Sequence, residues 1–415
     1  MKGILVIIDG LGDRPCKKLS GKTPLESAHI PNLDYFASNG ELGYMYSAGE
    51  NFVPESDSAV LAILGNKVSP GFRGYFEALG AGIELGRGDL ALRTNFATIE
   101  DLKSLNVIDR RAGRTLTTQE ANLLSNSLNK ELKLPCKFLF KNTVQHRGVF
   151  ILRGGFSDNI TNTDPEYRSK GEIKLKDKLN YSLPLDEEDN AKYTANIVNE
   201  FIEQSYKILN EHPVNQKRRI KGMLPANIII TRDASSSIPA IKQFKNWASI
   251  VNMPLEIGIS QASAMKVFSI EYPELINHDV YKNLFEGLGS ACKFAVKTLK
   301  SQKDKFDYFY VHFKEPDVPG HDNLPEQKKL MIEFLDKEFF SFLKDFSKKN
   351  KINILVTADH STPCELKNHS ADPVPVLLCN WHGKIQKHFS ELEARQGSLG
   401  KIFGVDLLKK VGFVR

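Results

Sequence analysis

The sequence has no apolar run long enough to cross a membrane. A membrane-spanning helix needs about 20 consecutive apolar residues. The longest apolar run near the start, Ile4 to Ile8, has only the length of a strand. This start also lacks the longer apolar region and the small-residue cleavage site of a secretion signal. We therefore expect a cytoplasmic protein that does not bind membranes.

Cysteine is scarce as well. The chain of 415 residues contains five cysteines, Cys16, Cys136, Cys292, Cys364 and Cys379. None belongs to a C-x-x-C pair, and their number is odd, so a disulfide framework is not expected. We predict that all five are structural thiols. Cys364 alone lies close to a stretch rich in histidine.

A strong excess of charge is also missing. Lys and Arg outnumber Asp and Glu by six, which gives a formal net charge of +6. Charged residues make up 26% of the chain and hydrophobic residues 41%, which is ordinary for a globular protein. The basic residues are dispersed, which argues against a nucleic-acid-binding role. The mild positive charge suits a small anionic ligand. The short cluster 217–219 (Lys-Arg-Arg) is either a solvated turn or part of an anion site.

Buried strands and helices alternate at both ends of the chain. The apolar run before Asp9 is typical of a strand buried on both faces in a parallel sheet. Similar runs cover residues 226–231, 308–313, 352–357 and 374–379, and helical patterns cover 281–302, 327–348 and 392–402. This alternation predicts an α/β domain with a mostly parallel sheet and helices on both faces.

The middle of the chain has another pattern. Short β-like runs, such as 90–98 and 144–152, accompany one helical candidate at 187–209, and the polar tract 158–178 is expected to form a loop or flap. A chain of this length is expected to form two domains. We predict a discontinuous α/β domain of residues 1–70 and 236–415. A smaller α+β domain, residues 71–235, would interrupt it.

Carboxylates and imidazoles follow several of the predicted strands. They are Asp9 after the first strand, Asp317 and His321 after 308–313, Asp359 and His360 after 352–357, and His369 before 374–379. Ligands bind beyond the carboxyl ends of strands in open α/β sheets. Each residue alone is equally consistent with a turn, a cap or plain surface. Together with a serine they are too many for one tetrahedral ion, and they predict two divalent ions.

The identity of the ions follows from the ligand chemistry. Mixed carboxylate and imidazole ligands suit Mn²⁺ or Zn²⁺, and Mg²⁺ if carboxylates dominate. His312 falls inside the strand 308–313, and we expect it to be a polar residue at the edge of the core.

A serine near these ligands is a candidate nucleophile. Residues 54–65 form a turn that runs into a helix, with Ser56 or Ser58 at its N-terminus. The free N–H groups and positive dipole of a helix N-terminus stabilise an anion there. A bound metal ion also lowers the pKa of a hydroxyl. Either serine could instead be a simple helix cap, and the residues alone do not decide between the two.

Several motifs resemble the alkaline phosphatase superfamily. They are Asp9 within 7–14, Ser56 within 55–57, Asp317 to His321, residues 358–360, and His369. Further motifs at 75–85, 92–98, 108–114 and 212–215 keep their order along nearly the whole chain, which resembles the archaeal-type 2,3-bisphosphoglycerate-independent phosphoglycerate mutases. The resemblance implies a two-domain isomerase of glycolysis and gluconeogenesis. It would interconvert 3- and 2-phosphoglycerate through a phosphoserine, without 2,3-bisphosphoglycerate.

The resemblance also implies a role for each matching residue. One divalent ion would be held by Asp317, His321 and His369, and the other by Asp9, Ser56, Asp359 and His360. The ions would be Mn²⁺ or Mg²⁺, with Zn²⁺ as a third candidate. Ser56 would be the nucleophile, and Lys266 would neutralise phosphate. Glycerate and phosphate would be held by Asp109, Arg110, Arg114, His146 and Arg232, with Asp109 as the acid–base group. A homo-oligomer is a further option.

The chain departs from the family pattern at three places. Glu55 and Asp233 stand where the family has glycine, and Asn66 and Lys67 replace part of a Gly-Tyr-Asp-Pro motif. The metal ligands are all present, so these departures concern the substrate more than phosphoryl transfer itself. The nearest alternative is a phosphatase or phosphotransferase for another small hydroxy acid or amino acid, such as homoserine. A metal-dependent binding module without chemistry is a more distant one.

Overall fold

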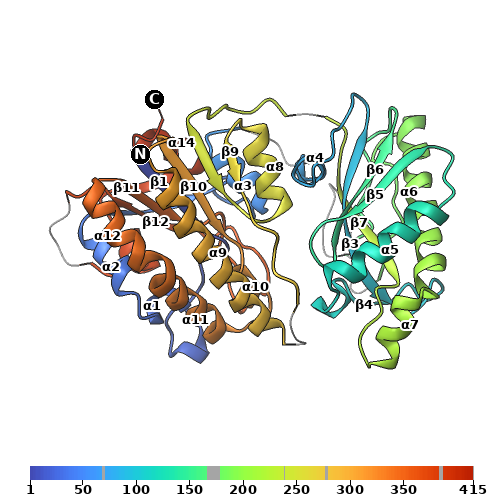
Figure 1. The fold of residues 1–415 in the computed structure, drawn as a ribbon, viewed down its shortest axis with the longest axis horizontal. Coiled ribbons are helices and arrows are strands. Elements are labelled where there is room, and N and C mark those ends of the chain that lie inside the picture. Colours follow the sequence, from blue (N-terminus) through green and yellow to red (C-terminus); the bar gives the residue numbers. More distant parts are fainter. Residues whose placement is uncertain (68–70, 166–177, 238, 276–278, 383–386, 415) are drawn as a thin grey trace. The chain divides into compact units, whose positions relative to one another are not determined.

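The chain forms two compact units (Figure 1). The computed structural model describes residues 1–67, 71–165, 178–237, 239–275, 279–382 and 387–414. Unit 1 consists of Met1–Ser69, Ala240–Pro273 and Tyr281–Arg415, and unit 2 of Pro70–Pro239 and Glu274–Val280. Within the described ranges, no helix has both the length and the apolar character needed to cross a membrane.

An eight-stranded sheet forms the centre of unit 1. Its order is β13-β2-β12-β11-β1-β10-β8-β9. The strands are β1 (Gly3–Ile8), β2 (Glu41–Tyr46), β8 (Trp247–Ile250), β9 (Lys266–Phe268), β10 (Tyr308–Phe313), β11 (Asn353–Thr357), β12 (Val374–Cys379) and β13 (Gly400–Phe403). β12 runs antiparallel to both of its neighbours, and the other strands share one direction. The predicted mostly parallel α/β fold is confirmed, but the expectation that 374–379 is a parallel strand is wrong.

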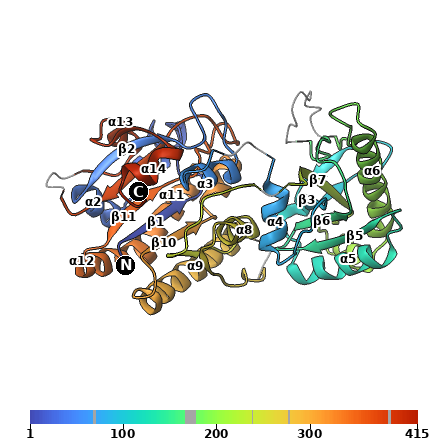
Figure 2. The ribbon, with the colours of Figure 1, turned by 90° about the horizontal axis from the view of Figure 1, so that it is seen from above.

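Helices cover both faces of this sheet, which explains why every residue of β1 is buried. They are α1 (Pro24–Ser27), α2 (Pro31–Ser38), α3 (Ser56–Ile63), α8 (Pro254–Ala262), α9 (Val280–Gln302), α10 (Asp317–His321), α11 (Pro325–Leu335), α12 (Ser341–Asn350), α13 (Glu391–Arg395) and α14 (Gly404–Lys410). Figure 2 shows β1, β10 and β11 between α3 and α14 on one side and α9 and α12 on the other.

Two predicted helices of unit 1 differ from the observed ones. The pattern at 327–348 is divided into α11 and α12 by a π-helical segment, η3 (Asp336–Phe340). The pattern at 392–402 is helical only in α13 and continues as β13. Gly400, at the start of β13, has a φ of +61°, which a helix does not allow.

Unit 2 is an antiparallel sheet with helices on both faces. Its strands are β3 (Leu90–Ile99), β4 (Val107–Asp109), β5 (Lys137–Asn142), β6 (Arg147–Arg153) and β7 (Ile228–Ser235), with order β4-β3-β6-β5 and β7 paired to β3. The run 226–231, predicted as a parallel strand, is therefore antiparallel. A continuous apolar run shows that a strand is buried on both faces, but it does not show the direction of the strand.

The helices of unit 2 bury two separate apolar clusters. α4 (Arg73–Gly80) packs on one face with Ala91 and Val149, while α5 (Thr118–Glu131) and α6 (Asp189–Asn210) cover the large core on the other. The helix predicted at 187–209 is confirmed by α6. Of the predicted loop 158–178, residues 166–177 lie outside the described residues.

The fold shows the surroundings of the basic cluster 217–219 and of the five cysteines. The cluster 217–219 belongs to α7 (Pro213–Ile220), and Arg218 within it is fully buried, so a solvated turn is the wrong description of this residue. All five cysteines are free thiols.

Candidate metal centre

Three neighbouring strands of unit 1 end at the same level of the sheet. Ile8, at the end of β1, pairs with Phe313 of β10, and Ile7 pairs with Thr357 of β11. The residues that follow each strand therefore leave the sheet side by side. This places Asp9 next to the segments that carry the other predicted ligands.

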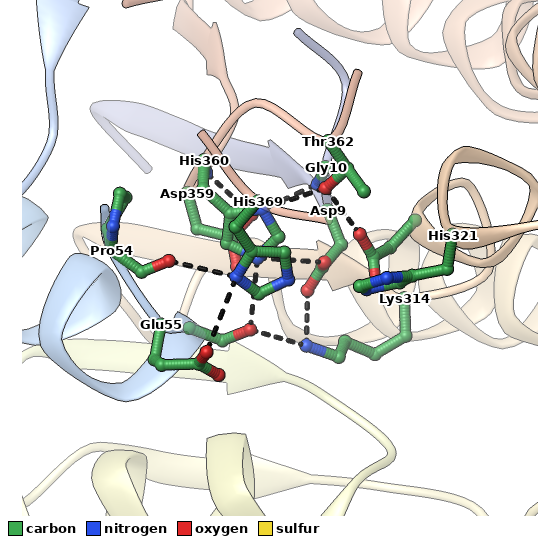
Figure 3. A network of polar contacts seen from close by, with 12 residues as sticks. Asp9, Gly10, Pro54, Glu55, Lys314, His321, Asp359, His360, Thr362 and His369 are labelled. Atoms are coloured by element: carbon green, nitrogen blue, oxygen red, sulfur yellow. Dashed lines mark hydrogen bonds and ion pairs between the residues drawn. The ribbon is translucent and has the colours of Figure 1, made fainter. Parts of the chain in front are cut away.

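The predicted ligands form two groups that could hold metal ions. One group is Asp317, His360 and His369, and the other is Asp9, Asp359 and His360. His321 lies beside the first group, with Nε2 at 3.2 Å from the Asp317 carboxylate. Ser56 lies beside the second, with Oγ at 3.3 Å from His360 Nε2. Thus all seven predicted ligands lie in one cluster, most of which is drawn in Figure 3.

The hydrogen bonds of the three histidines suit metal binding. His321 and His369 each donate from Nδ1 to a backbone carbonyl, of Lys367 at 3.1 Å and of Pro54 at 2.9 Å. His360 Nδ1 lies 3.1 Å from the hydroxyl of Thr362, which donates its own proton to Asp317. With Nδ1 used in this way, Nε2 is the atom that each ring would offer to a metal ion.

The carboxylates also have oxygens available for an ion. Asp359 Oδ1 accepts the backbone N–H groups of Gly10 and His360, at 3.2 and 3.0 Å. Asp359 Oδ2 and Asp9 Oδ1 are buried and accept no hydrogen bond from the described residues. A buried carboxylate oxygen without a partner is costly, and a divalent cation would remove that cost. The residues therefore fit one or more divalent ions.

Burial favours the neutral form of the shared histidine. Burial, together with the neighbouring His369, lowers the pKa of His360 to about 3. The imidazole is therefore neutral near pH 7 and ready to act as a ligand. For Asp317, burial would raise the pKa, but His321 and the other two histidines outweigh it and hold the pKa well below its usual value.

Ser56 is the first residue of α3 and is buried with the ligands. Its Oγ lies 3.1 Å from Nζ of Lys314, which donates to it. Ser58 faces away, because its hydroxyl donates to the backbone carbonyl of Glu55 at 3.0 Å. Of the two predicted candidates, only Ser56 has its hydroxyl among the metal-binding groups.

Lys314 connects the serine to the carboxylates. Its Nζ contacts Asp9 Oδ2 and lies 3.2 Å from Glu256 Oε1, and Figure 3 shows the side chain reaching toward Asp9. Burial alone would lower the pKa of Lys314, but Asp9, Glu256 and Asp359 outweigh it and raise that pKa above its usual value. The ammonium group is therefore a permanent positive charge beside Ser56.

The structure does not bring Lys266 to this centre. Lys266 is exposed at the start of β9. Its register through β8 and β10 aligns it with Ile4, five positions before Asp9, and β9 lies three strands away from β1. Lys266 is therefore displaced from Asp9 both along the strand direction and across the sheet. The structure therefore places Lys314, and not Lys266, beside Ser56 and Asp9.

Three contributors to the centre were missed in the sequence. Lys314 directly follows a buried strand, which is the signal that identified Asp9. Glu256, in α8, is an acidic residue in an otherwise apolar stretch. His312 is buried rather than at the core edge, and its Nε2 donates to Asp9 Oδ2 at 2.9 Å. Asp9, Glu256 and His312 form a third group whose ligand atoms lie close together.

Unit 2 carries a cluster of arginines on the face of its sheet that α4 covers. Side chains alternate along a strand, so Arg93 shares this face with Ala91. Arg93 pairs across the strands with Arg232. Like charges placed opposite each other destabilise a sheet. Burial, with the charges of Arg232 and Arg73, lowers the pKa of Arg93 to about 9.

Two carboxylates among the described residues lie against this cluster. Glu77 Oε1 lies 3.3 Å from Arg93 and 3.6 Å from Arg73. Asp233 Oδ2 lies 3.5 Å from Arg232. These three arginines outnumber the two carboxylates beside them, so the cluster is suited to an anion.

The remaining predicted substrate residues also lie in unit 2. The pKa of the buried His146 lies well below its usual value. Burial is the largest cause, followed by the charge of Arg147 and then by those of Arg111 and Arg114. Asp109 Oδ1 accepts the backbone N–H groups of Arg111 and Gly113, at 2.7 and 2.9 Å, so this oxygen shapes the turn.

Arg110 has a different partner from the arginines near His146. Its guanidinium makes a bidentate ion pair with Asp164, at 2.6 and 2.7 Å. Arg73, Arg93, Arg111 and Arg147 were missed in the sequence, since arginine is common on surfaces and these four stand on a helix, two strands and a turn that only the fold brings together.

Comparison with known sequences gives one consistent family. Residues 37–215 match the family model described as 2,3-bisphosphoglycerate-independent phosphoglycerate mutase. A relative of that name from Pyrococcus furiosus is 37% identical over 98% of this chain and 95% of its own length. One from Archaeoglobus fulgidus is 38% identical over 98% of this chain and 96% of its own.

Solved structures agree with the sequence comparison. A protein from Pyrococcus horikoshii is similar over 100% of this chain and 98% of its own, with a TM-score of 0.74 and 30% identity. A cofactor-independent phosphoglycerate mutase from Thermoplasma acidophilum is similar over 100% and 99%, with a TM-score of 0.55 and 28% identity. The similarity therefore extends over both units.

Proposed function

The chain belongs to the family of 2,3-bisphosphoglycerate-independent phosphoglycerate mutases, and we propose that it interconverts 3- and 2-phosphoglycerate through a phosphorylated Ser56. The observation that carries this proposal is the position of Ser56 Oγ, 3.3 Å from His360 and 3.1 Å from Lys314. The names of the relatives favour the mutase over the phosphatase alternative, since every one reported is a mutase.

The ligand groups support two divalent ions, Mn²⁺ or Mg²⁺, with Zn²⁺ as a further candidate. Asp317, His321 and His369 would hold one ion, and Asp9, Ser56, Asp359 and His360 the other. Bound ions would hold the serine oxygen deprotonated and offset the charge that builds on the phosphoryl oxygens.

Two features of the chain would assist attack by Ser56. Ser56 lies at the N-terminus of α3, where the positive end of the helix dipole favours an anion. The ammonium of Lys314 donates a hydrogen bond to Oγ and would offset negative charge on the phosphoryl group. Both groups lie at Ser56 within unit 1.

The arginine cluster of unit 2 is the anion-binding site that we assign to the substrate. Arginine grips carboxylate and phosphate groups with two parallel hydrogen bonds, and Arg93 and Arg232 are buried beside an excess of positive charge. Retention of glycerate would let the phosphoryl group return to its other hydroxyl. The same retention would limit hydrolysis of the phosphoserine by water.

The test is Ser56→Ala, assayed with Mn²⁺ for conversion of 3- to 2-phosphoglycerate. We expect a loss of at least about 10³-fold in kcat, because the variant lacks the hydroxyl that would carry the phosphoryl group. Mass spectrometry of the wild type after brief incubation with substrate should find phosphate on Ser56. A Ser56→Ala protein that retains a comparable rate would refute the phosphoserine scheme.

The matched control is Ser58→Ala, two residues along the same helix. Ser58 bonds only to the carbonyl of Glu55 among its described partners, so its loss should change the rate by less than a few-fold. Inorganic phosphate is measured in the same assays. If phosphate rather than 2-phosphoglycerate accumulates in the wild type, the enzyme is a phosphatase.

A further inference from the structure

Lys328, on α11, is completely buried, although lysine is among the residues least often found inside proteins. Its ammonium has three N–H groups and three acceptors. These are the carbonyl of Gly12 at 3.1 Å, Asp13 Oδ2 at 2.8 Å and the carbonyl of Thr362 at 3.0 Å. Every donor is therefore used within unit 1.

The three acceptors belong to two loops that carry metal-binding residues. Gly12 and Asp13 follow Asp9 in the loop after β1, and Thr362 follows His360 in the loop after β11. The loops also bond to each other, because Thr362 N–H donates to Gly12 O at 3.0 Å. Asp13 adds a second bridge, since its Oδ1 accepts the N–H of Cys364 at 3.1 Å.

Thr362 extends this connection to the ligands themselves. Its hydroxyl donates to Asp317 Oδ1 at 2.6 Å and lies 3.1 Å from His360 Nδ1. Asp317 and His360 belong to one of the two ligand groups of the proposed metal centre, and His360 to both. A displacement of Thr362 would therefore move ligands of both groups at once.

A buried ion pair is an expensive way to stabilise a fold, because both charges lose their water. Its directional bonds can instead fix the geometry of the groups around it. We infer that Lys328, paired with Asp13, is a positioning residue that holds the loops after β1 and β11 in the arrangement that binds the divalent ions. This inference rests on the proposed function, since it assumes that the centre binds metal.

The test is the affinity of Lys328→Met for Mn²⁺, measured by calorimetric titration of the metal-free protein at a temperature where it is folded. Removal of a group that orients ligands typically weakens metal binding about 10–100-fold, and we expect that loss here. The matched control is Lys329→Met, the next residue on α11, which pairs only loosely with Glu333 at 3.9 Å. Its affinity should equal that of the wild type.

A second variant covers the case in which Lys328→Met does not fold. Thr362→Val keeps the size of the side chain and the carbonyl that Lys328 bonds, but removes the hydroxyl between Asp317 and His360. It should weaken Mn²⁺ binding by a similar factor. In the double variant the two losses should not multiply, since both act through one connection.

Three results would overturn the inference. They are wild-type affinity in a folded Lys328→Met protein, wild-type affinity in Thr362→Val, and losses that multiply in the double variant. Failure of the proposed function has a different signature, because the wild-type protein itself would then bind no Mn²⁺.

Discussion

Asp9 has two carboxylate oxygens in two different environments. Oδ1 faces His360 Nε2 at 3.5 Å and accepts no hydrogen bond from the described residues, so it is available for a metal ion. Oδ2 accepts from His312 and contacts Lys314. One carboxylate thus orients the lysine that contacts Ser56 and, with its other oxygen, would bind metal. A change at Asp9 would therefore affect both at once, whereas a change at Lys314 isolates the lysine.

Lys314→Met should lower kcat for the mutase reaction by about 10²–10³-fold, the usual cost of removing one group that stabilises charge in the transition state. Lys266→Met should stay within about two-fold of the wild type, because Lys266 is exposed and remote from the strand ends. Both variants are assayed by coupled conversion of 3-phosphoglycerate in Mn²⁺. A larger loss in Lys266→Met than in Lys314→Met would reverse the assignment.

The three departures from the family pattern have local explanations. Asp233 adopts a φ of +55°, a conformation that glycine accepts freely and that aspartate tolerates better than most residues. Its carboxylate lies near Arg232 and Arg73. Asn66 is buried, donates to the carbonyls of Leu61 and Leu64 at the end of α3 and accepts Lys242 N–H at 2.7 Å. Glu55 lies 3.8 Å from His369 Nδ1. Glu55 and Asp233 thus make side-chain contacts that glycine could not.

At the scale of the element, α7 supports the turn that carries Arg111 and Arg114. Ala112, Gly113 and Arg114 have φ angles of +46°, +68° and +55°, which cost energy in the two residues that are not glycine. Arg218, buried on α7, donates to Thr115 O at 3.1 Å, Thr115 Oγ1 at 2.8 Å and Ala112 O at 3.3 Å. These bonds hold the turn in its strained form.

Arg218→Met should lower the free energy of unfolding by about 2–4 kcal/mol, because the acceptors of its buried guanidinium lose their partner. It should also raise KM for 3-phosphoglycerate, since the turn near His146 would relax. Lys217→Met, an exposed neighbour on the same helix, should change stability by less than about 0.5 kcal/mol. Urea unfolding followed by circular dichroism measures the first effect. Equal stability of the two variants would show that Arg218 does not support the turn.

Strands and long helices were predictable because their patterns are local. The run before Asp9 and the periodicity of α6 are each contained within one segment. The division of 327–348 by η3 was not predicted, and this segment makes contacts that are remote in the sequence. Asp336, in η3, accepts the N–H groups of Asn32 and Leu33, at 3.2 and 2.8 Å, and so caps α2. An acidic residue in a helical pattern carries no sign of a partner 300 positions away.

In the candidate site, too, some residues could be predicted from local patterns and others could not. Asp9, Asp359 and His360 were found because they directly follow apolar strands, which is visible in the sequence. The cluster around Arg93 was not found, because it depends on the pairing of β3 with β7. Lys314 carries the same signal as Asp9, but its contact with Ser56 depends on where α3 lies in the fold.

At the scale of the molecule, the metal centre belongs to unit 1 alone. All the proposed ligands, and both tryptophans, Trp247 and Trp381, lie in its segments. The arginine cluster lies in unit 2. Tryptophan fluorescence therefore reports on unit 1 only, which allows the effect of metal on each unit to be separated.

Removal of divalent ions with EDTA should lower the temperature of the unfolding transition seen by tryptophan fluorescence, because ions that bind only the folded state stabilise it. Addition of Mn²⁺ in excess should restore the transition and the mutase activity together. Circular dichroism at the same time follows the helices of both units. If neither EDTA nor Mn²⁺ changes the temperature of the fluorescence transition, the result would contradict a metal centre in unit 1.

The central place of β1 has a consequence for synthesis. β1 pairs with β10 and β11, whose residues Tyr308 and Asn353 lie opposite Gly3. At about 5–20 residues per second, the ribosome releases β1 about 15–60 s before its first partner exists. The strands that the structure describes in unit 2, by contrast, lie between Leu90 and Ser235. The newly made chain must therefore keep its most apolar strand shielded while the middle of the protein is already able to pair.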